Sequence, residues 1–125
     1  MARCVDTVLL PIPTDSLDAY RELATRVGEV WIEHGALSYF EGVSDEPKTN
    51  GSEDPGESFS GRLDTAETES IVFASIAFES ADHRDEVRAA VMKDPTYREH
   101  VGNDLPFDPQ RMTRGSFSGI VDYQG

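Results

Sequence analysis

The chain has little lysine, a single cysteine and no long apolar run, and each shortage excludes a class of protein. Its 125 residues include 24 acidic and 11 basic side chains, so the formal net charge is −13. No two Lys or Arg residues are adjacent, which excludes the clustered positive charge that binds a nucleic-acid backbone. No run of about eighteen apolar residues exists, so we expect no membrane span. No basic segment precedes an apolar one, so we expect no signal peptide and a cytoplasmic location.

Cysteine and histidine are too few for the common metal and nucleophile motifs. Cys4 is the single cysteine, so it cannot form an internal disulfide, and no neighbour in the sequence activates its thiol. The three histidines are not arranged as H-E-x-x-H, and neither a dinucleotide or phosphate-binding glycine motif nor a serine-hydrolase elbow is present. We therefore expect an inert Cys4, no metal and no cofactor.

The scarcity of lysine indicates an environment. Nine of the eleven basic residues are Arg, and only Lys48 and Lys93 are Lys. In molar salt the Debye length falls to about 3 Å, so the mutual repulsion of surface carboxylates is largely screened. This composition favours the salt-rich cytoplasm of a halophile. The alternative is an acidic protein from an ordinary cell.

Hydrophobic periodicity predicts the order β-α-β-β-α-β. Alternating or continuous apolar runs predict strands at 5–12, 36–43, 70–78 and 111–122. One helix is expected to begin after Thr14 or Asp15 and to end at His34-Gly35, where glycine favours the left-handed conformation.

The second half of the chain contains the other helical segment and a long loop. Ser80 is expected to cap a helix that Asp94-Pro95 interrupts, and a short helical turn follows. Residues 44–68 are rich in turn-forming residues and predict a long loop with a weak strand near 59–63.

This order predicts an α+β, ferredoxin-like fold over residues 1–125 as a single domain. In that fold a four-stranded antiparallel sheet carries two helices on one face. The predicted strand 70–78 is apolar on both faces, so its second face requires a cover. A second copy of the chain is the simplest cover, which predicts a homodimer through the open sheet face. The alternative is a monomer with one exposed apolar strand.

Three blocks of sequence are similar to those of the YbaA-like domain-of-unknown-function family. They read WIEHGALSYFE at 31–41, HRDEV and VMKDP at 83–87 and 91–95, and LPFD, RM and GSF between 105 and 117. The resemblance implies a dimeric α+β barrel. The family has no assigned reaction, so no catalytic residue is carried over. The chain departs from the family pattern at Ser75, where Trp is expected, and at Ser116, where Gly is expected.

One group of residues is a candidate catalytic site. Tyr39 and Glu41 are two apart on a predicted strand and so share a face, and His34 ends the preceding helix. A carboxylate among apolar neighbours can act as a base near neutrality. These residues would serve a cofactor-independent oxygenase or isomerase that acts on a small apolar substrate. The alternative is structural, with Glu41 paired to an arginine and His34 interacting with the helix end.

A second group consists of large apolar side chains, Trp31, Phe73, Met112 and Phe117. Residues of this kind are usually core, but barrels of this architecture hold small apolar molecules between helices and sheet, so these four are candidate pocket residues.

The leading hypothesis for the function is a small-molecule-binding or accessory homodimer. The enzyme described above is the second hypothesis, and a purely structural self-associating module is the third. His83 is expected to be structural, and Arg84 and Arg88 to pair with nearby acids such as Asp85.

Overall fold

An antiparallel sheet organises the part of the chain described by the computed structural model, which is residues 2–45, 56–102 and 104–125. The strands occur in the order β2-β3-β1-β4, as expected for the ferredoxin-like fold that the sequence predicts. Their bounds are β1 (Cys4–Pro13), β2 (Ser38–Val43), β3 (Glu69–Phe78) and β4 (Thr113–Ser118). The last strand is shorter than the predicted 111–122 because residues 109–111 form a 3₁₀ turn and pairing with β1 ends at Ser118.

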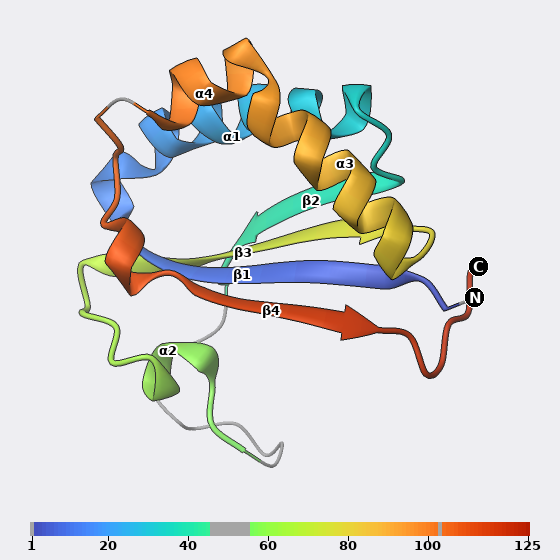
Figure 1. Ribbon diagram of the computed structural model, residues 1–125. Helices are drawn as coiled ribbons and strands as arrows, with labels where there is room; N and C mark the ends of the chain where they lie inside the picture. The colour runs from blue at the N-terminus through green and yellow to red at the C-terminus, as the bar shows by residue number, and fades with distance from the viewer. Residues whose placement is uncertain (1, 46–55, 103) are drawn as a thin grey trace.

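Three helices cover one face of this sheet (Figure 1). They are α1 (Leu17–Glu33), α3 (Ala81–Lys93) and α4 (Pro95–Val101). The short helix α2 (Phe59–Arg62) lies on the other side of the sheet. Within the described residues, no helix has the length and apolar character needed to cross a membrane.

The ends of the helices follow the predicted signals, with one exception. Gly35 has φ +111° just after α1, and the Ser80 side chain accepts a hydrogen bond from the backbone N–H of His83. Asp94 caps α4 by accepting from the backbone N–H groups of Thr96 and Tyr97. The exception is the start of α1. Residues 14–16 form a 3₁₀ turn instead of a side-chain cap, and α1 begins at Leu17.

The weak strand predicted near 59–63 is wrong, because these residues form α2 and its C-cap. Phe59 and Leu63 are four residues apart, which matches one helical turn as well as it matches a short strand. The Ser58 side chain accepts from the backbone N–H of Gly61 and so starts the turn. Residues 46–55 of the predicted loop lie outside the described residues.

Strand register separates the two faces of the sheet. Phe78, Ile76 and Ala74 of β3 pair with Cys4, Asp6 and Val8 of β1, so all of these point toward the helices. Trp31 of α1 packs edge-on against Phe78, with ring centroids 6.0 Å apart, and also contacts Tyr97 of α4. Phe78 and Val91 are fully buried, so the core lies between β3 and helices α1 and α3.

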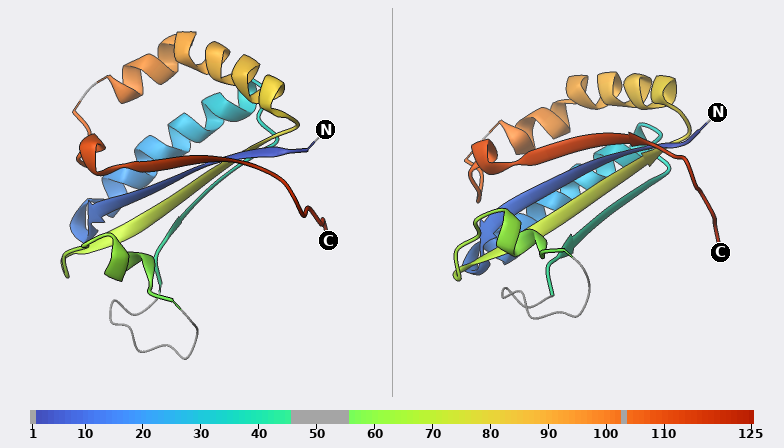
Figure 2. Two further views of the ribbon diagram at one scale, coloured as in Figure 1. Left: turned by 60° about the horizontal axis from the view of Figure 1, so that its bottom comes forward. Right: turned by 90° about the horizontal axis from the view of Figure 1, so that it is seen from below.

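The opposite face of the sheet is apolar and largely exposed in the single chain, although α2 lies on this side and Ile71 of β3 is buried there. The right-hand view of Figure 2 shows this side from below, with strands β1 and β3 in front of α1. Phe40 and Phe117 are 58% and 59% exposed, and Phe73 is 37% exposed. The rings of Phe40 and Phe73 lie 6.4 Å apart on neighbouring strands. Strand β3 therefore has apolar side chains on both faces, as the sequence predicts.

Candidate ligand cavity

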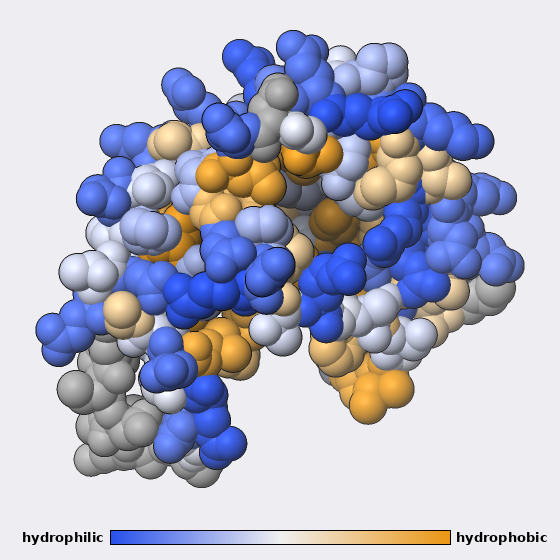
Figure 3. All heavy atoms as spheres, turned by 60° about the vertical axis from the view of Figure 1, so that its left-hand side comes forward, coloured by the Kyte–Doolittle hydropathy of each residue, from blue (hydrophilic) through white to orange (hydrophobic). Residues whose placement is uncertain are grey.

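A cavity of about 1190 Å³ lies between the helices and the sheet. The space-filling view shows a hollow in which apolar side chains gather, surrounded by polar ones (Figure 3). Ligand pockets typically have volumes of about 300–1,000 Å³, so this one is large enough for a small molecule.

One wall of the cavity is the inward face of α1. Tyr20, Ala24, Val27 and Trp31 follow helical spacing along it, and all four line the cavity. Sequence periodicity predicts this stripe. It does not predict that the stripe faces an open space as well as the core.

The floor of the cavity consists of two rows of residues that run across all four strands. The first row is Glu41, Ala74, Val8 and Arg114, and the second is Tyr39, Ile76, Asp6 and Ser116. Residues directly opposite one another on paired strands point to the same face, and all eight line the cavity.

The connection between α4 and β4 passes from the helix layer down to the sheet at one end of the cavity (Figure 1). Leu105, Phe107 and Met112 of this connection line the cavity. Phe107 makes an edge-on contact with Tyr20 of α1, with ring centroids 5.7 Å apart. This segment includes the LPFD block of the family resemblance, and the structure gives that block a place in the cavity wall.

Glu41 is the centre of a polar cluster in this apolar setting. The hydroxyls of Tyr20 and Tyr39 each donate a hydrogen bond to the Glu41 carboxylate, one to each oxygen. All three side chains are half-buried. Glu41 therefore interacts with two tyrosines rather than with the arginine of the structural alternative.

Both tyrosines of this cluster are held in the neutral form. Burial raises the pKa of Tyr20 well above its ordinary value, and the adjacent Glu41 raises it further. Burial also raises the pKa of Tyr39 in the same direction, with Glu41 again adding to the shift. The two phenols thus act as hydrogen-bond donors to Glu41, and neither is available as a phenolate base near neutral pH.

Gly28 allows the ring of Tyr39 to reach this position. A Cβ atom on Gly28 would lie 2.8 Å from Cδ1 of Tyr39, closer than van der Waals contact allows. Because Gly28 has no side chain, the Tyr39 ring packs directly against the backbone of α1, and the ring position depends on that glycine.

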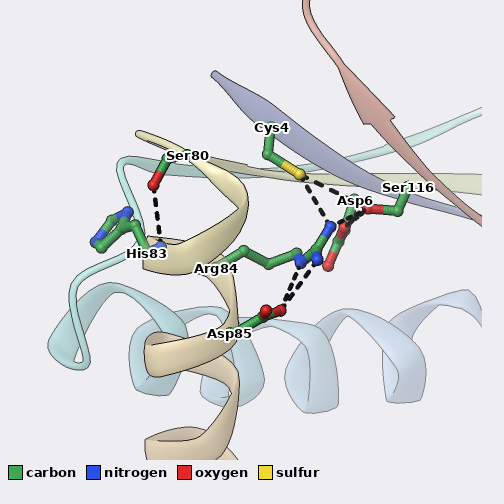
Figure 4. A network of polar contacts seen from close by, with 7 residues as sticks. All are labelled: Cys4, Asp6, Ser80, His83, Arg84, Asp85 and Ser116. Atoms are coloured by element: carbon green, nitrogen blue, oxygen red, sulfur yellow. Dashed lines mark hydrogen bonds and ion pairs between the residues drawn. The ribbon is translucent and has the colours of Figure 1, made fainter. Parts of the chain in front are cut away.

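A second polar cluster lies near β4 and the start of α3 (Figure 4). Arg84 Nη1 donates to the Ser116 hydroxyl at 2.7 Å, and Ser116 donates to Asp6 Oδ1 at 2.6 Å. Arg84 also pairs with Asp85, with its Nε 3.0 Å from Oδ1, as predicted. This pairing raises the pKa of the Arg84 guanidinium. Ser116 thus connects α3 to β1.

Cys4 has a charged neighbour that the sequence does not predict. Arg84 Nη1 lies 3.2 Å from Cys4 Sγ, although the two residues are far apart in the chain. The thiol is buried, with 2% of the residue exposed, and it does not line the cavity. The expectation that Cys4 lacks an activating neighbour is corrected, and its inertness remains a prediction.

The structure separates the histidines from the Glu41 cluster. His34 Nε2 lies 2.7 Å from Asp94 Oδ2, and His34 does not line the cavity. His83 Nδ1 accepts from the backbone N–H of Glu79, and its ring packs against Phe78. Of the candidate catalytic residues, Tyr39 and Glu41 are therefore brought together, and His34 is not.

Of the four candidate pocket residues, Trp31 and Met112 line the cavity. Phe73 and Phe117 do not, because they lie on the open face of the sheet. Phe73 alternates with the helix-facing Val72 and Ala74, and Phe117 pairs with Val5, not with the helix-facing Asp6. Tyr20 and Phe107 were missed as pocket residues. The signal for Tyr20 is a tyrosine within an otherwise apolar helical stripe.

The described residues contain no group of three or more His, Cys, Asp or Glu side chains placed to hold a metal ion. The chemistry that this cavity offers is therefore that of phenols, carboxylates and guanidinium groups around an apolar centre.

Comparison with known sequences relates nearly the whole chain to one family. Residues 3–109 match the model of a family described as "Protein of unknown function (DUF1428)". The chain is 34% identical over 119 residues to the uncharacterized protein YbaA of Escherichia coli strain K12. This match covers 94% of the chain and 97% of that relative. The same values hold for the uncharacterized protein YbaA of Shigella flexneri.

Solved structures share the fold at low sequence identity. A dimeric ferredoxin-like protein from an uncultured marine organism has a TM-score of 0.59 and 8% identity, and the match covers 98% of this chain and all of that one. Rv0793 from Mycobacterium tuberculosis has a TM-score of 0.55 and 16% identity, covering 99% of this chain and 100% of that one. A putative antibiotic biosynthesis monooxygenase from Nitrosomonas europaea has a TM-score of 0.56 and 16% sequence identity. The match covers 95% of this chain and 91% of that one. Each similarity concerns the fold alone.

Proposed function

Because the chain belongs to the DUF1428 family of proteins of unknown function, its role has to be argued from its own cavity, and we propose that it is a small-molecule-binding protein. The ligand occupies the space between the sheet and helices α1, α3 and α4. The working form is a homodimer of single-domain protomers in a salt-rich cytoplasm.

The cavity itself is the observation that carries this proposal. It combines a volume of about 1190 Å³ with an apolar wall and a polar cluster formed by Glu41, Tyr20 and Tyr39. A mainly apolar pocket with a few convergent polar groups is the usual form of a small-molecule site. A purely structural module would have no use for a hollow of this size beneath its helices, because filling it would increase stability.

The catalytic alternative receives less support. An oxygenase or isomerase that uses Glu41, Tyr39 and His34 needs these groups around one substrate, and His34 interacts with Asp94 instead. The raised pKa of Tyr39 keeps its phenol protonated. The similarity to the Nitrosomonas europaea protein is one of fold at 16% identity, so it transfers no reaction.

Binding can be tested with 8-anilinonaphthalene-1-sulfonate as the probe. Trp31 lines the cavity and is the only tryptophan, so its fluorescence reports on occupancy. We expect saturable binding at one site per chain, with quenching of Trp31. Ala74→Leu adds bulk to the cavity floor and should weaken binding by about tenfold.

The matched control is Ala89→Leu, which adds the same side chain to the exposed face of α3. It should leave the affinity within about twofold. Equal affinity in wild type and both variants would mean that the dye binds elsewhere, for instance on the open sheet face, and would contradict the proposal. Circular dichroism and thermal unfolding establish that each variant folds.

A further inference from the structure

The first row of the cavity floor has opposite charges at its two ends. Glu41 stands on edge strand β2 and Arg114 on edge strand β4, and the residues between them are Ala74 and Val8. Neighbouring strands are about 4.8 Å apart, so three strand spacings place the two backbone positions about 14 Å from each other. The floor is therefore a short apolar strip with a carboxylate at one end and a guanidinium at the other.

The three side chains of the Glu41 cluster, Glu41, Tyr20 and Tyr39, offer a ligand only hydrogen-bond acceptors. The phenolic hydrogens of Tyr20 and Tyr39 are already donated to the carboxylate. The remaining lone pairs on the two phenol oxygens and on Glu41 can accept further hydrogen bonds, but these three groups have no hydrogen left to donate. A ligand group that fits here must itself donate, and a protonated amine does so with the added attraction of opposite charge.

The other end of the strip offers donors. Arg114 and Arg88 both line the cavity, and neither guanidinium has a hydrogen-bond or ion-pair partner among the residues that the structure describes. Arg84, close by, is engaged by Asp85, Ser116 and Cys4. A free guanidinium presents a planar fork of donors that matches a carboxylate, phosphate or sulfate group.

We propose that the ligand is an elongated molecule with an apolar middle, an amine at one end held by Glu41 and an anionic group at the other end held by Arg114. The proposal rests on the cavity being a small-molecule site and specifies the class of molecule. It also gives the direction in which the ligand lies, across the strands from edge strand β2 to edge strand β4.

Four probes with the same apolar chain separate the contributions of the two ends. These are 8-aminooctanoic acid, octylamine, octanoic acid and 1-octanol, titrated against Trp31 fluorescence and by calorimetry. Glu41→Gln should weaken the two amine-bearing probes by about tenfold and leave octanoic acid and 1-octanol within about twofold. Arg114→Gln should weaken the two acids by about tenfold and leave octylamine and 1-octanol unchanged.

Matched charge controls are Glu33→Gln on α1 and Arg98→Gln on α4, both exposed and neither lining the cavity. They should change no affinity by more than about twofold. If Glu41→Gln fails to fold, Arg114→Gln still tests the anionic end, because Arg114 lies on the exposed surface of an edge strand.

The possible failures are distinguishable. If all four probes bind, and the Glu41 and Arg114 variants affect them equally, the bipolar ligand is excluded while the small-molecule site stands. If none of the four probes binds and 8-anilinonaphthalene-1-sulfonate does not bind either, the small-molecule site fails and the bipolar ligand with it. If the dye binds but 8-aminooctanoic acid does not, only the bipolar ligand is overturned.

Discussion

Gly28 determines where the ring of Tyr39 can lie, and through that ring it affects the hydrogen bonds on Glu41. The ring packs against the bare backbone of α1, where a Cβ atom would lie within 2.8 Å and 2.9 Å of two ring carbons. A glycine within a helix normally lowers stability, and alanine there restores about 1 kcal/mol. Here the close approach of the ring reverses that expectation.

Gly28→Ala is therefore expected to lower the free energy of unfolding by about 1–2 kcal/mol, because overpacking outweighs the gain in helix propensity. Urea denaturation followed by circular dichroism measures the change.

The control for this prediction is a double-mutant cycle with Tyr39→Ala. In the Tyr39→Ala background the clash is absent, so Gly28→Ala should stabilise by about 1 kcal/mol. A stabilising effect in the wild-type background as well would show that the Tyr39 ring can move away without cost.

Sequence reasoning finds a residue when spacing places it on a face, and misses it when a distant partner gives it its role. Tyr39, Glu41 and Trp31 are predicted as site residues because two-residue and helical spacings orient them. The contacts of Tyr20 with Glu41 and of Arg84 with Cys4 depend on how α1 and α3 pack on the sheet. Local periodicity contains no information on that packing.

At the scale of elements, Asp94 connects three helices. Its backbone ends α3 and begins α4, and its side chain caps α4 while it also contacts His34 at the end of α1. The hydrogen bond from His34 lowers the pKa of the Asp94 carboxyl below its ordinary 3.8, and those from Tyr97 and Thr96 add to the shift. The folded state therefore favours the ionised carboxylate.

The sign of the resulting pH dependence follows from this direction. Stability contributed by a carboxyl with a lowered folded pKa is fully present above the unfolded value, here 3.8, and is lost as the pH falls through the folded pKa. Asp94→Asn keeps an oxygen for the cap and removes the charge. Wild type should be more stable than Asp94→Asn at about pH 5, and the difference should vanish toward about pH 2.

Urea unfolding across this pH range measures the difference. Asp82→Asn provides a matched control, since Asp82 is an exposed acid in the first turn of α3. A stability difference between wild type and Asp94→Asn that persists unchanged to about pH 2 would contradict an ionised Asp94 contact.

Sequence predicts the order and type of the long elements because their apolar patterns extend over many residues. Three more predictions come from local signals, and the structure has all three: the cap at Ser80, the helix break at Asp94-Pro95 and the glycine after α1. The short helix α2 is mistaken for a strand because Phe59 and Leu63 fit both periods. The start of α1 differs because a 3₁₀ turn replaces the expected side-chain cap.

At the scale of the whole molecule, the open face of the sheet is the main exposed apolar surface of the single chain. Phe40 and Phe73 present adjoining apolar area there, and Phe117 is exposed on the same face of edge strand β4. If a second copy covers this face, a charge placed on an apolar side chain of the face should be costly in the dimer and harmless in the monomer.

Phe117→Glu is thus expected to shift a homodimer toward monomers, raising the dissociation constant by at least about tenfold. Light scattering in high salt gives the mass directly. Ile32→Glu, which adds the same charge to an exposed apolar position on α1, should leave the dimer intact. A monomer mass for the wild-type protein would refute the homodimer.

The net charge of −13 per chain becomes −26 in a homodimer (2 × −13), so association must overcome strong repulsion at low ionic strength. Raising the salt from about 0.1 M to about 1 M shortens the Debye length from about 10 Å to about 3 Å. We expect the melting temperature to rise over this range, as measured by calorimetry. Equal melting temperatures at both salt concentrations would argue against adaptation to a salt-rich cytoplasm.

The strand order β2-β3-β1-β4 leaves β2 and β4 as edge strands, each hydrogen-bonded to a single neighbour. Such edges fray first, and their amide hydrogens exchange with solvent sooner than those of inner strands. A molecule bound to both Glu41 and Arg114 would link the two edge strands and restrain the motion of both. Binding should then slow amide exchange in β2 and β4 together, although no backbone hydrogen bond links one to the other.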